Sequence, residues 1–153
     1  MDRGFQIWPD QASNFAPKTD ALYALASQLR SAGVPLDGIG FQSHFTTTWY
    51  PSRAEMTDTL RRFAALGLEV EITELDVATQ DGSAAQLSKQ ADIYRDAASA
   101  CWAVPACGRI TVWGIDDGAT WLGVAKHPLP FDENYQPKPA YAALRGVHSQ
   151  TSR

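Results

Sequence analysis

The chain has 153 residues, of which 44% are hydrophobic and 20% charged, and its formal net charge is −4. This composition is typical of one soluble globular domain with a core of ordinary size. The weakly acidic balance argues against a nucleic-acid surface and suits a neutral substrate better than a polyanion. No apolar run reaches the about 18 residues of a membrane span. Met1–Pro9 lacks the apolar stretch of a signal peptide, so we expect no targeting segment there.

In chain order, the apolar periodicity predicts helices that alternate with strands. Helices are expected at residues 20–32, 52–67 and 83–101, and a short final helix from Lys138 to Tyr141 onward. Strands are expected at residues 38–45, 70–77 and 110–114. Two of the helices begin with the sequence of a capping box, Ser52 with Glu55 and Ser83 with Gln86.

The order α-β-α-β-α-β-α with short connections predicts parallel βαβ units, which both a doubly wound sheet and a barrel would satisfy. No glycine-rich phosphate loop follows any strand, so the sequence gives no support to nucleotide binding. Polar and aromatic residues stand at the three strand ends instead: Gln42 and His44, then Glu74 and Asp76, then Trp113 and Asp116. Barrel enzymes have their active sites at these ends, and the pattern favours such a site here.

The segment Ile72–Asp76 carries the strongest chemical signal. Glu74 and Asp76 lie two residues apart and therefore point to the same side of a strand, whereas Glu71 is expected on the opposite side. Singly, each strand-end residue has a structural explanation: a solvated loop start for the acids, a hydrogen-bonded histidine, and core packing for the tryptophans. Taken together, carboxylates, an imidazole and indoles at strand ends are typical of a glycosidase site.

Two cysteines, Cys101 and Cys107, have a spacing that does not match a CxxC redox motif, and two ligands alone do not make a zinc site. A short-loop disulfide and a pair of reduced buried cysteines both remain open, and the disulfide is favoured. It would join a helix to the following strand and stabilise the fold by about 2 kcal/mol. A disulfide also implies an oxidising compartment.

Several segments together closely resemble the C-terminal half of the glycoside hydrolase family 10 endo-β-1,4-xylanases. They are Gly-Ile-Gly-Phe-Gln-Ser-His-Phe (38–45), Ile-Thr-Glu-Leu-Asp (72–76), Ile-Thr-Val-Trp-Gly-Ile-Asp-Asp (110–117) and Phe-Asp-Glu-Asn-Tyr-Gln-Pro-Lys-Pro-Ala-Tyr (131–141). Residues 101–107 also resemble the disulfide hairpin of actinobacterial members. The resemblance implies an α/β fold, a partial TIM (β/α)8 barrel with strands six to eight and their helices. It divides the chain into an atypical N-terminal segment (1–17), the barrel part (18–148) and a tail (149–153).

Carried over residue by residue, the resemblance implies that Glu74 is the catalytic nucleophile, that His44 hydrogen-bonds it, and that Asp76 hydrogen-bonds His44. It implies that Gln42 binds substrate hydroxyls and that Trp113 and Trp121 wall the sugar subsites. The relay explains His44, Glu74 and Asp76 better than the alternative of a metal site, so we expect neither a metal nor a cofactor. His127 and His148 have no match in the family pattern and are expected at the surface.

One half of the implied site is missing from the sequence. A retaining glycosidase needs a second carboxyl group as general acid and base, which the family carries on its fourth strand in a Trp-x-x-x-Asn-Glu type segment. No such segment occurs here; Gly4–Trp8 is at best a remnant of the fifth strand, and Glu69 and Glu71 precede the strand end. The resemblance thus implies part of an extracellular endo-1,4-β-xylanase acting on xylan or xylooligosaccharides. It would be completed by a second copy or a separate N-terminal half. The alternative is a xylan-binding relic without turnover.

Overall fold

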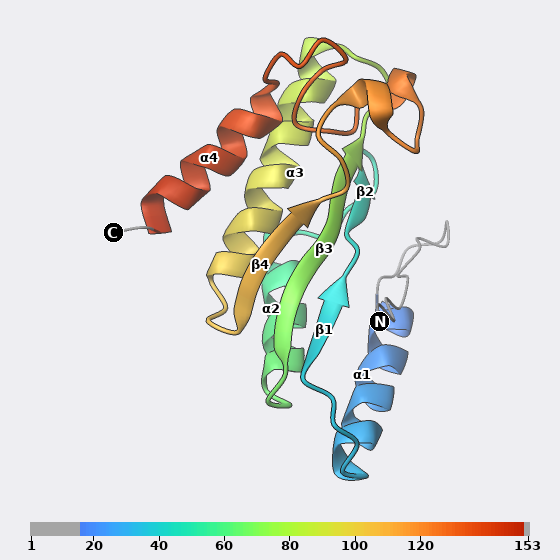
Figure 1. Ribbon diagram of the computed structural model, residues 1–153, viewed down its shortest axis with the longest axis vertical. Helices are drawn as coiled ribbons and strands as arrows, with labels where there is room; N and C mark the ends of the chain where they lie inside the picture. Colours follow the sequence, from blue (N-terminus) through green and yellow to red (C-terminus); the bar gives the residue numbers. More distant parts are fainter. Residues whose placement is uncertain (1–15, 152–153) are drawn as a thin grey trace.

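The computed structural model describes residues 16–151, and the predicted alternation of helices and strands is present in it (Figure 1). The helices are α1 (Ala16–Ser31), α2 (Arg53–Ala64), α3 (Ala84–Trp102) and α4 (Pro139–Thr151). The strands are β1 (Gly38–Phe41), β2 (His44–Thr46), β3 (Glu69–Ala78) and β4 (Cys107–Val112). Two short 3-10 turns, η1 (Asp117–Ala119) and η2 (Val124–Lys126), follow β4. The predicted segments 1–17 and 149–153 lie wholly or partly outside the described residues, and these boundaries stay predictions.

All strand pairs are parallel, as the βαβ order predicts. The long strand β3 lies in the centre, with β1 and β2 paired along one edge and β4 along the other. Among residues 16–151 no further strand pairs with the outer edges of β1 or β4. The carboxyl ends of all strands therefore meet at one end of the sheet.

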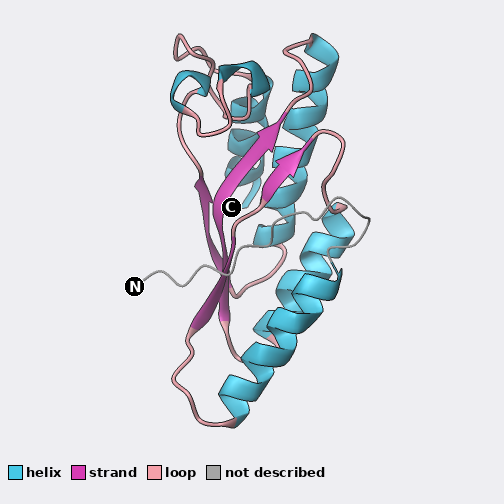
Figure 2. Ribbon diagram, turned by 90° about the vertical axis from the view of Figure 1, so that its right-hand side faces the viewer, coloured by secondary structure: helices cyan, strands magenta, loops and turns pink. Residues whose placement is uncertain are grey.

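The helices lie on one side of the sheet (Figure 2). The buried core between the two layers includes Phe63 of α2, Tyr94 of α3, and Val70 and Leu75 of β3. Helix α4 packs against α3 on the outside (Figure 1). Within the described part of the chain no helix is both long and apolar enough to cross a membrane.

The strand predicted at residues 38–45 is interrupted. Ser43 has φ 63°, a left-handed conformation that is uncommon for a residue other than glycine. The chain therefore forms two short strands, β1 and β2, on either side of Gln42 and Ser43. The second strand places His44 directly beside Asp76 in the parallel ladder.

Strand β3 contains a bulge that corrects one sequence expectation. Val70 and Ile72 point into the core, and so do Leu75 and Val77, so the alternation shifts by one residue between 72 and 75. Glu71 was expected on the opposite side from Glu74; because of the shift both lie on the face away from the core. Bulges commonly redirect side chains next to active sites. Here the bulge is what turns Glu74 out of the helix-facing core.

The capping boxes have different outcomes. At α2 the box is complete, because the Ser52 hydroxyl accepts from the Glu55 N–H and the Glu55 carboxylate accepts from the Ser52 N–H. At α3 only half of it forms: Ser83 accepts from the Gln86 N–H, but Gln86 Oε1 accepts from the Thr47 hydroxyl instead. That side chain thereby ties the start of α3 to the loop after β2.

A disulfide joins Cys101 at the end of α3 to Cys107 at the start of β4, as favoured from the sequence. Both cysteines are buried. The bond thus closes the tight connection between the helix and the strand at the end of the sheet opposite to the candidate site.

Candidate active site

The centre of the candidate site is the imidazole of His44, which lies between two carboxylates. Its Nε2 is 3.1 Å from Glu74 Oε2, and its Nδ1 is 2.9 Å from Asp76 Oδ1. Asp76 is fully buried and the side chain of Glu74 is 11% exposed, so only Glu74 faces the open side. The structure therefore brings together the three residues that the resemblance assigns to the relay.

The surroundings of His44 favour its charged form. Burial alone would lower the pKa of the imidazole, but the hydrogen bonds and negative charges of Asp76 and Glu74 outweigh burial and raise the pKa above its ordinary value of 6.5. A protonated imidazole donates one N–H to each carboxylate. It then fixes the direction in which the Glu74 oxygens point.

Gln42 lies on the same open face as Glu74, at the break between β1 and β2. Its Nε2 donates to Glu74 Oε1 over 3.4 Å, a long hydrogen bond, and the Glu74 N–H donates to the Gln42 carbonyl at 3.1 Å. Gln42 is 5% exposed. Among the described residues the Gln42 Oε1 is buried without a hydrogen-bond partner, so it is available to a hydroxyl group that enters the site.

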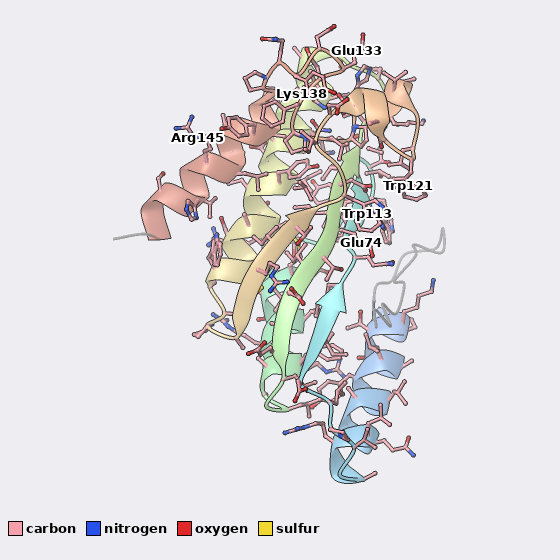
Figure 3. All side chains as sticks on the ribbon, viewed as in Figure 1. Glu74, Trp113, Trp121, Glu133, Lys138 and Arg145 are labelled. Carbon is pink, nitrogen blue, oxygen red and sulfur yellow. A yellow bond between two sulfur atoms is a disulfide. The ribbon has the colours of Figure 1, made fainter. Side chains whose placement is uncertain are left out.

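Two tryptophans form the wall of the site, and Figure 3 shows Trp113, Trp121 and Glu74 together near the carboxyl end of β3. Trp113 and Trp121 are 45% and 48% exposed, so the alternative of core aromatics does not hold. Their rings meet the His44 ring edge-on, at centroid distances of 6.4 Å and 5.1 Å. The Trp121 indole Nε1 also donates to Asp76 Oδ2 at 2.8 Å.

The loop that carries Trp121 is anchored by a buried ion pair. Lys138 Nζ donates to Asp117 Oδ2 at 2.8 Å and to the carbonyl oxygens of His127 and Leu129, both at 2.7 Å. The other Asp117 oxygen accepts from the Leu129 N–H at 2.8 Å. Burial lowers the pKa of Lys138, and the nearby carboxylates, chiefly Asp117, offset this in part. The pair ties three segments of the 113–138 loop into one unit.

Helix α3 holds the same loop from its other side. Gln90 Nε2 donates to the carbonyl oxygens of Val77 and His127, and the Tyr94 hydroxyl donates to the Pro128 carbonyl at 2.7 Å. His127 was expected at the surface but is half-buried, with its ring against Gly82 and its Nδ1 3.7 Å from Asp117 Oδ2. His148, in contrast, is exposed as expected.

Sequence reasoning missed these anchoring residues. Lys138 and Asp117 both fall inside the segments that carry the family resemblance, but a lysine between two prolines and an aspartate after a strand are typical of surface loops. The only sign of their importance in the sequence was that both residues lie near the segments that contain Trp113 and Trp121. Their pairing requires the fold of the loop, which the local pattern does not encode.

The described residues contain no group of three or more His, Cys, Asp or Glu side chains that could hold a metal ion. Within the relay of His44, Glu74 and Asp76, the position of His44 explains why no metal site forms. Both ring nitrogens already face carboxylate oxygens, so neither is available as a metal ligand.

A parallel sheet with helices on one face, and with polar and aromatic side chains collected at the carboxyl ends of its strands, is the arrangement of a barrel enzyme's active site. The family model "Glycosyl hydrolase family 10" matches residues 10–147. The chain belongs to this family, and its fold is part of the family's TIM barrel, as expected.

Two relatives illustrate the similarity. The chain is 36% identical over 136 residues to endo-1,4-beta-xylanase B of Neocallimastix patriciarum, covering 89% of this chain and 15% of that protein. It is 40% identical over 135 residues to endo-1,4-beta-xylanase B of Thermotoga neapolitana, covering 84% of this chain and 38% of the relative. The chain thus spans well under half the length of these curated relatives.

Solved structures give the same result. Xylanase 10B of Thermotoga petrophila in complex with xylobiose matches with a TM-score of 0.82 and 37% identity, covering 92% of this chain and 44% of that one. A mutant of xylanase10C from Cellvibrio japonicus in complex with xylopentaose matches with a TM-score of 0.76 and 32% identity, covering 85% and 31% of the two chains.

Proposed function

We propose that this chain is the nucleophile-bearing part of a retaining endo-1,4-β-xylanase. The observation that carries the proposal is the imidazole of His44 held between Glu74 and Asp76 beside two exposed indoles. Family membership supports the glycoside hydrolase class, and the site geometry supports the particular assignment of roles.

In this mechanism the Glu74 carboxylate attacks the anomeric carbon of a xylose unit while the glycosidic C–O bond breaks, which gives a covalent glycosyl-enzyme. Water then hydrolyses that ester and the configuration is retained. The attack requires an ionised, fixed carboxylate. His44 and Asp76 meet this requirement, because the imidazole donates to Glu74 and Asp76 stabilises the positive charge on the ring.

The substrate class is supported by the wall of the site. Trp113 and Trp121 offer exposed indole faces of the kind on which sugar rings stack, and Gln42 has an amide close to Glu74 that suits a sugar hydroxyl. Two solved relatives of similar fold were crystallised with xylobiose and xylopentaose. We therefore propose xylan or xylooligosaccharides as the ligands.

Turnover needs a second carboxyl group about 5–5.5 Å from the nucleophile. We propose that a separate N-terminal half of the barrel, or a second copy of the chain, completes the site along the unpaired edges of β1 and β4. Purified alone, the chain is expected to be oligomeric or aggregated in analytical ultracentrifugation, because open parallel-sheet edges and an uncovered inner face favour association. A monodisperse monomer with a cooperative melt would contradict this.

We also propose an extracellular location. The Cys101–Cys107 disulfide supports it, because such bonds persist mainly in oxidising compartments.

The proposal is tested by intact-protein mass spectrometry after incubation with an activated aryl 2-deoxy-2-fluoro-xylobioside. The good leaving group needs little acid catalysis, and the fluorine slows hydrolysis of the intermediate, so the missing acid does not block labelling. We expect one glycosyl adduct, located on Glu74 and absent in Glu74→Gln. Glu71→Gln is the matched control, since it removes a carboxylate from the same face of the same strand and should still be labelled.

The second candidate is a xylan-binding relic without turnover, in which Gln42 and the exposed Trp113 and Trp121 hold sugars. Titration calorimetry with xylotriose distinguishes it from the first. A folded chain that binds xylotriose equally well before and after Glu74→Ala, and that never acquires the fluoro-sugar adduct, would be the relic.

A further inference from the structure

We propose that Trp121 is a positioning residue of the relay as well as a sugar-facing side chain. Its indole N–H holds Asp76, so that Trp121, Asp76, His44 and Glu74 form one hydrogen-bonded chain from the wall of the site to its nucleophile. The catalytic consequence rests on the proposed function, whereas the positioning is a property of the folded chain.

The two oxygens of Asp76 are each held by a different donor. Oδ1 lies 2.9 Å from His44 Nδ1, and Oδ2 accepts the Trp121 Nε1–H at 2.8 Å. Asp76 is 0% exposed. A carboxylate with no access to water depends on such charge-assisted bonds, so loss of the indole donor leaves one of its oxygens without compensation. The carboxylate would then rotate or admit water, and the acceptor for His44 would no longer be fixed.

Trp121 combines two environments in one side chain. The residue is 48% exposed, which leaves part of the indole open to a ligand, yet its nitrogen reaches a fully buried carboxylate. Its ring centroid is 5.1 Å from that of His44. A tryptophan that served only as a stacking surface would not need its N–H directed inward.

Trp113 provides the internal comparison. It is exposed to nearly the same extent, 45%, and its ring also meets His44 edge-on, at 6.4 Å. Among residues 16–151 the structure gives its indole nitrogen no contact with Asp76. The two tryptophans therefore share the stacking role, and only Trp121 has the positioning role.

The 113–138 loop is anchored on both sides of Trp121, which holds the indole N–H toward Asp76. Trp121 lies between η1 and η2, and both sides of that segment are anchored. Asp117 receives hydrogen bonds from Lys138 and Leu129, and the Lys126 carbonyl accepts from the Thr79 N–H at 2.8 Å, just beyond the end of β3. A ligand that seats on the indole and restrains it would consequently restrain Asp76 and the relay as well.

The test replaces Trp121 with β-(3-benzothienyl)alanine, which keeps the bicyclic shape and puts sulfur in place of N–H, and makes the same replacement at Trp113 as the matched control. Trp121→Phe and Trp113→Phe form a second pair. The first readout is the hydrogen-exchange rate of the His44 Nδ1 proton in histidine-labelled chain, assigned by its absence in His44→Asn. This readout needs no activity. The second is the rate of labelling by the fluoro-xylobioside.

We expect the His44 proton to exchange at least tenfold faster in both Trp121 variants and at the parent rate in both Trp113 variants. Labelling should slow at least tenfold more in the benzothienyl variant at 121 than in the one at 113. Equal exchange rates in the parent and the benzothienyl variant at 121 would overturn the inference. If the parent is not labelled at all, the proposed function fails and the exchange comparison alone decides the positioning role.

Discussion

Replacing Lys138 by methionine tests whether its buried ion pair with Asp117 holds the 113–138 loop, which carries Trp121, in place. The residue is 7% exposed, and its ammonium group makes three hydrogen bonds, one to Asp117 and two to backbone carbonyls. Methionine is of similar length but supplies no donor. Asp117, which is 1% exposed, would then keep the Leu129 N–H at 2.8 Å and the more distant His127 Nδ1 at 3.7 Å as its side-chain partners among the contacts described above.

The cost follows from removing the buried cation that pairs with Asp117. Removing one partner of a buried pair typically lowers the free energy of unfolding by about 3–5 kcal/mol. The net value of the intact pair is smaller, and the lowered pKa of Lys138 agrees with this, because Asp117 does not fully offset the burial of the ammonium group. Lys138→Met combined with Asp117→Asn should therefore regain at least half of the loss, since the amide is neutral and still accepts from Leu129.

The assay is urea unfolding, with all variants at one protein concentration because any self-association would contribute to stability. Lys126→Met, an exposed lysine in the same loop, is the control and should stay within about 0.5 kcal/mol of the parent. A loss below about 1 kcal/mol for Lys138→Met, or a double variant no more stable than the single one, would refute the reasoning.

Three further predictions concern the rest of the fold. Reducing the Cys101–Cys107 disulfide should lower the free energy of unfolding by about 2 kcal/mol, measured by urea unfolding with and without reductant; a Cys101→Ala, Cys107→Ala variant that still responds to reductant would contradict it. A Cβ on Gly40 would lie 2.6 Å from Thr73 Cγ2, so Gly40→Ala should cost about 1–3 kcal/mol and Thr73→Ser should relieve it; no relief would exclude this clash as the cause. Because the folded state raises the pKa of His44, its stabilising effect is complete below the unfolded value of about 6.5 and is lost as the pH rises through the folded value. The stability difference between the parent and His44→Asn should therefore shrink as the pH rises above about 6.5, and a constant difference would argue against it.

The features that could be predicted from the sequence depend on two rules, the periodic spacing of apolar residues and the pairing of parallel strands. Apolar spacing located α2 and α3, and the Ser52–Glu55 box marked the start of α2 correctly because its two hydrogen bonds are local. The placement of His44 beside Asp76 could also be predicted, because strands that are expected to be parallel bring their carboxyl ends together. These features depend on neighbours in sequence or on one simple rule of topology.

The features that the sequence did not predict depend on contacts between distant segments. The bulge in β3 reflects its different registers with β1 and β4, and strict alternation therefore put Glu71 on the wrong face. Gln86 has the sequence of a capping residue but bonds Thr47, which lies 39 residues earlier. Lys138 pairs with Asp117 across 21 residues of loop. None of these partners can be found by a local pattern.

The positions of the relay residues on neighbouring strands determine which catalytic steps a partial barrel could support. His44 lies on β2, Glu74 and Asp76 on β3, and the two strands are neighbours in one ladder. Trp121 comes from the loop after β4, which pairs with β3 from the other side. The proposed nucleophile and the groups proposed to orient it are thus held by adjacent strands within this chain. The general acid must approach from across the sugar and so belongs to a different part of a barrel. Under the proposed function, formation of the glycosyl-enzyme and its acid-assisted turnover are therefore separable, which is why covalent labelling is a sharper test of this chain than hydrolysis of xylan.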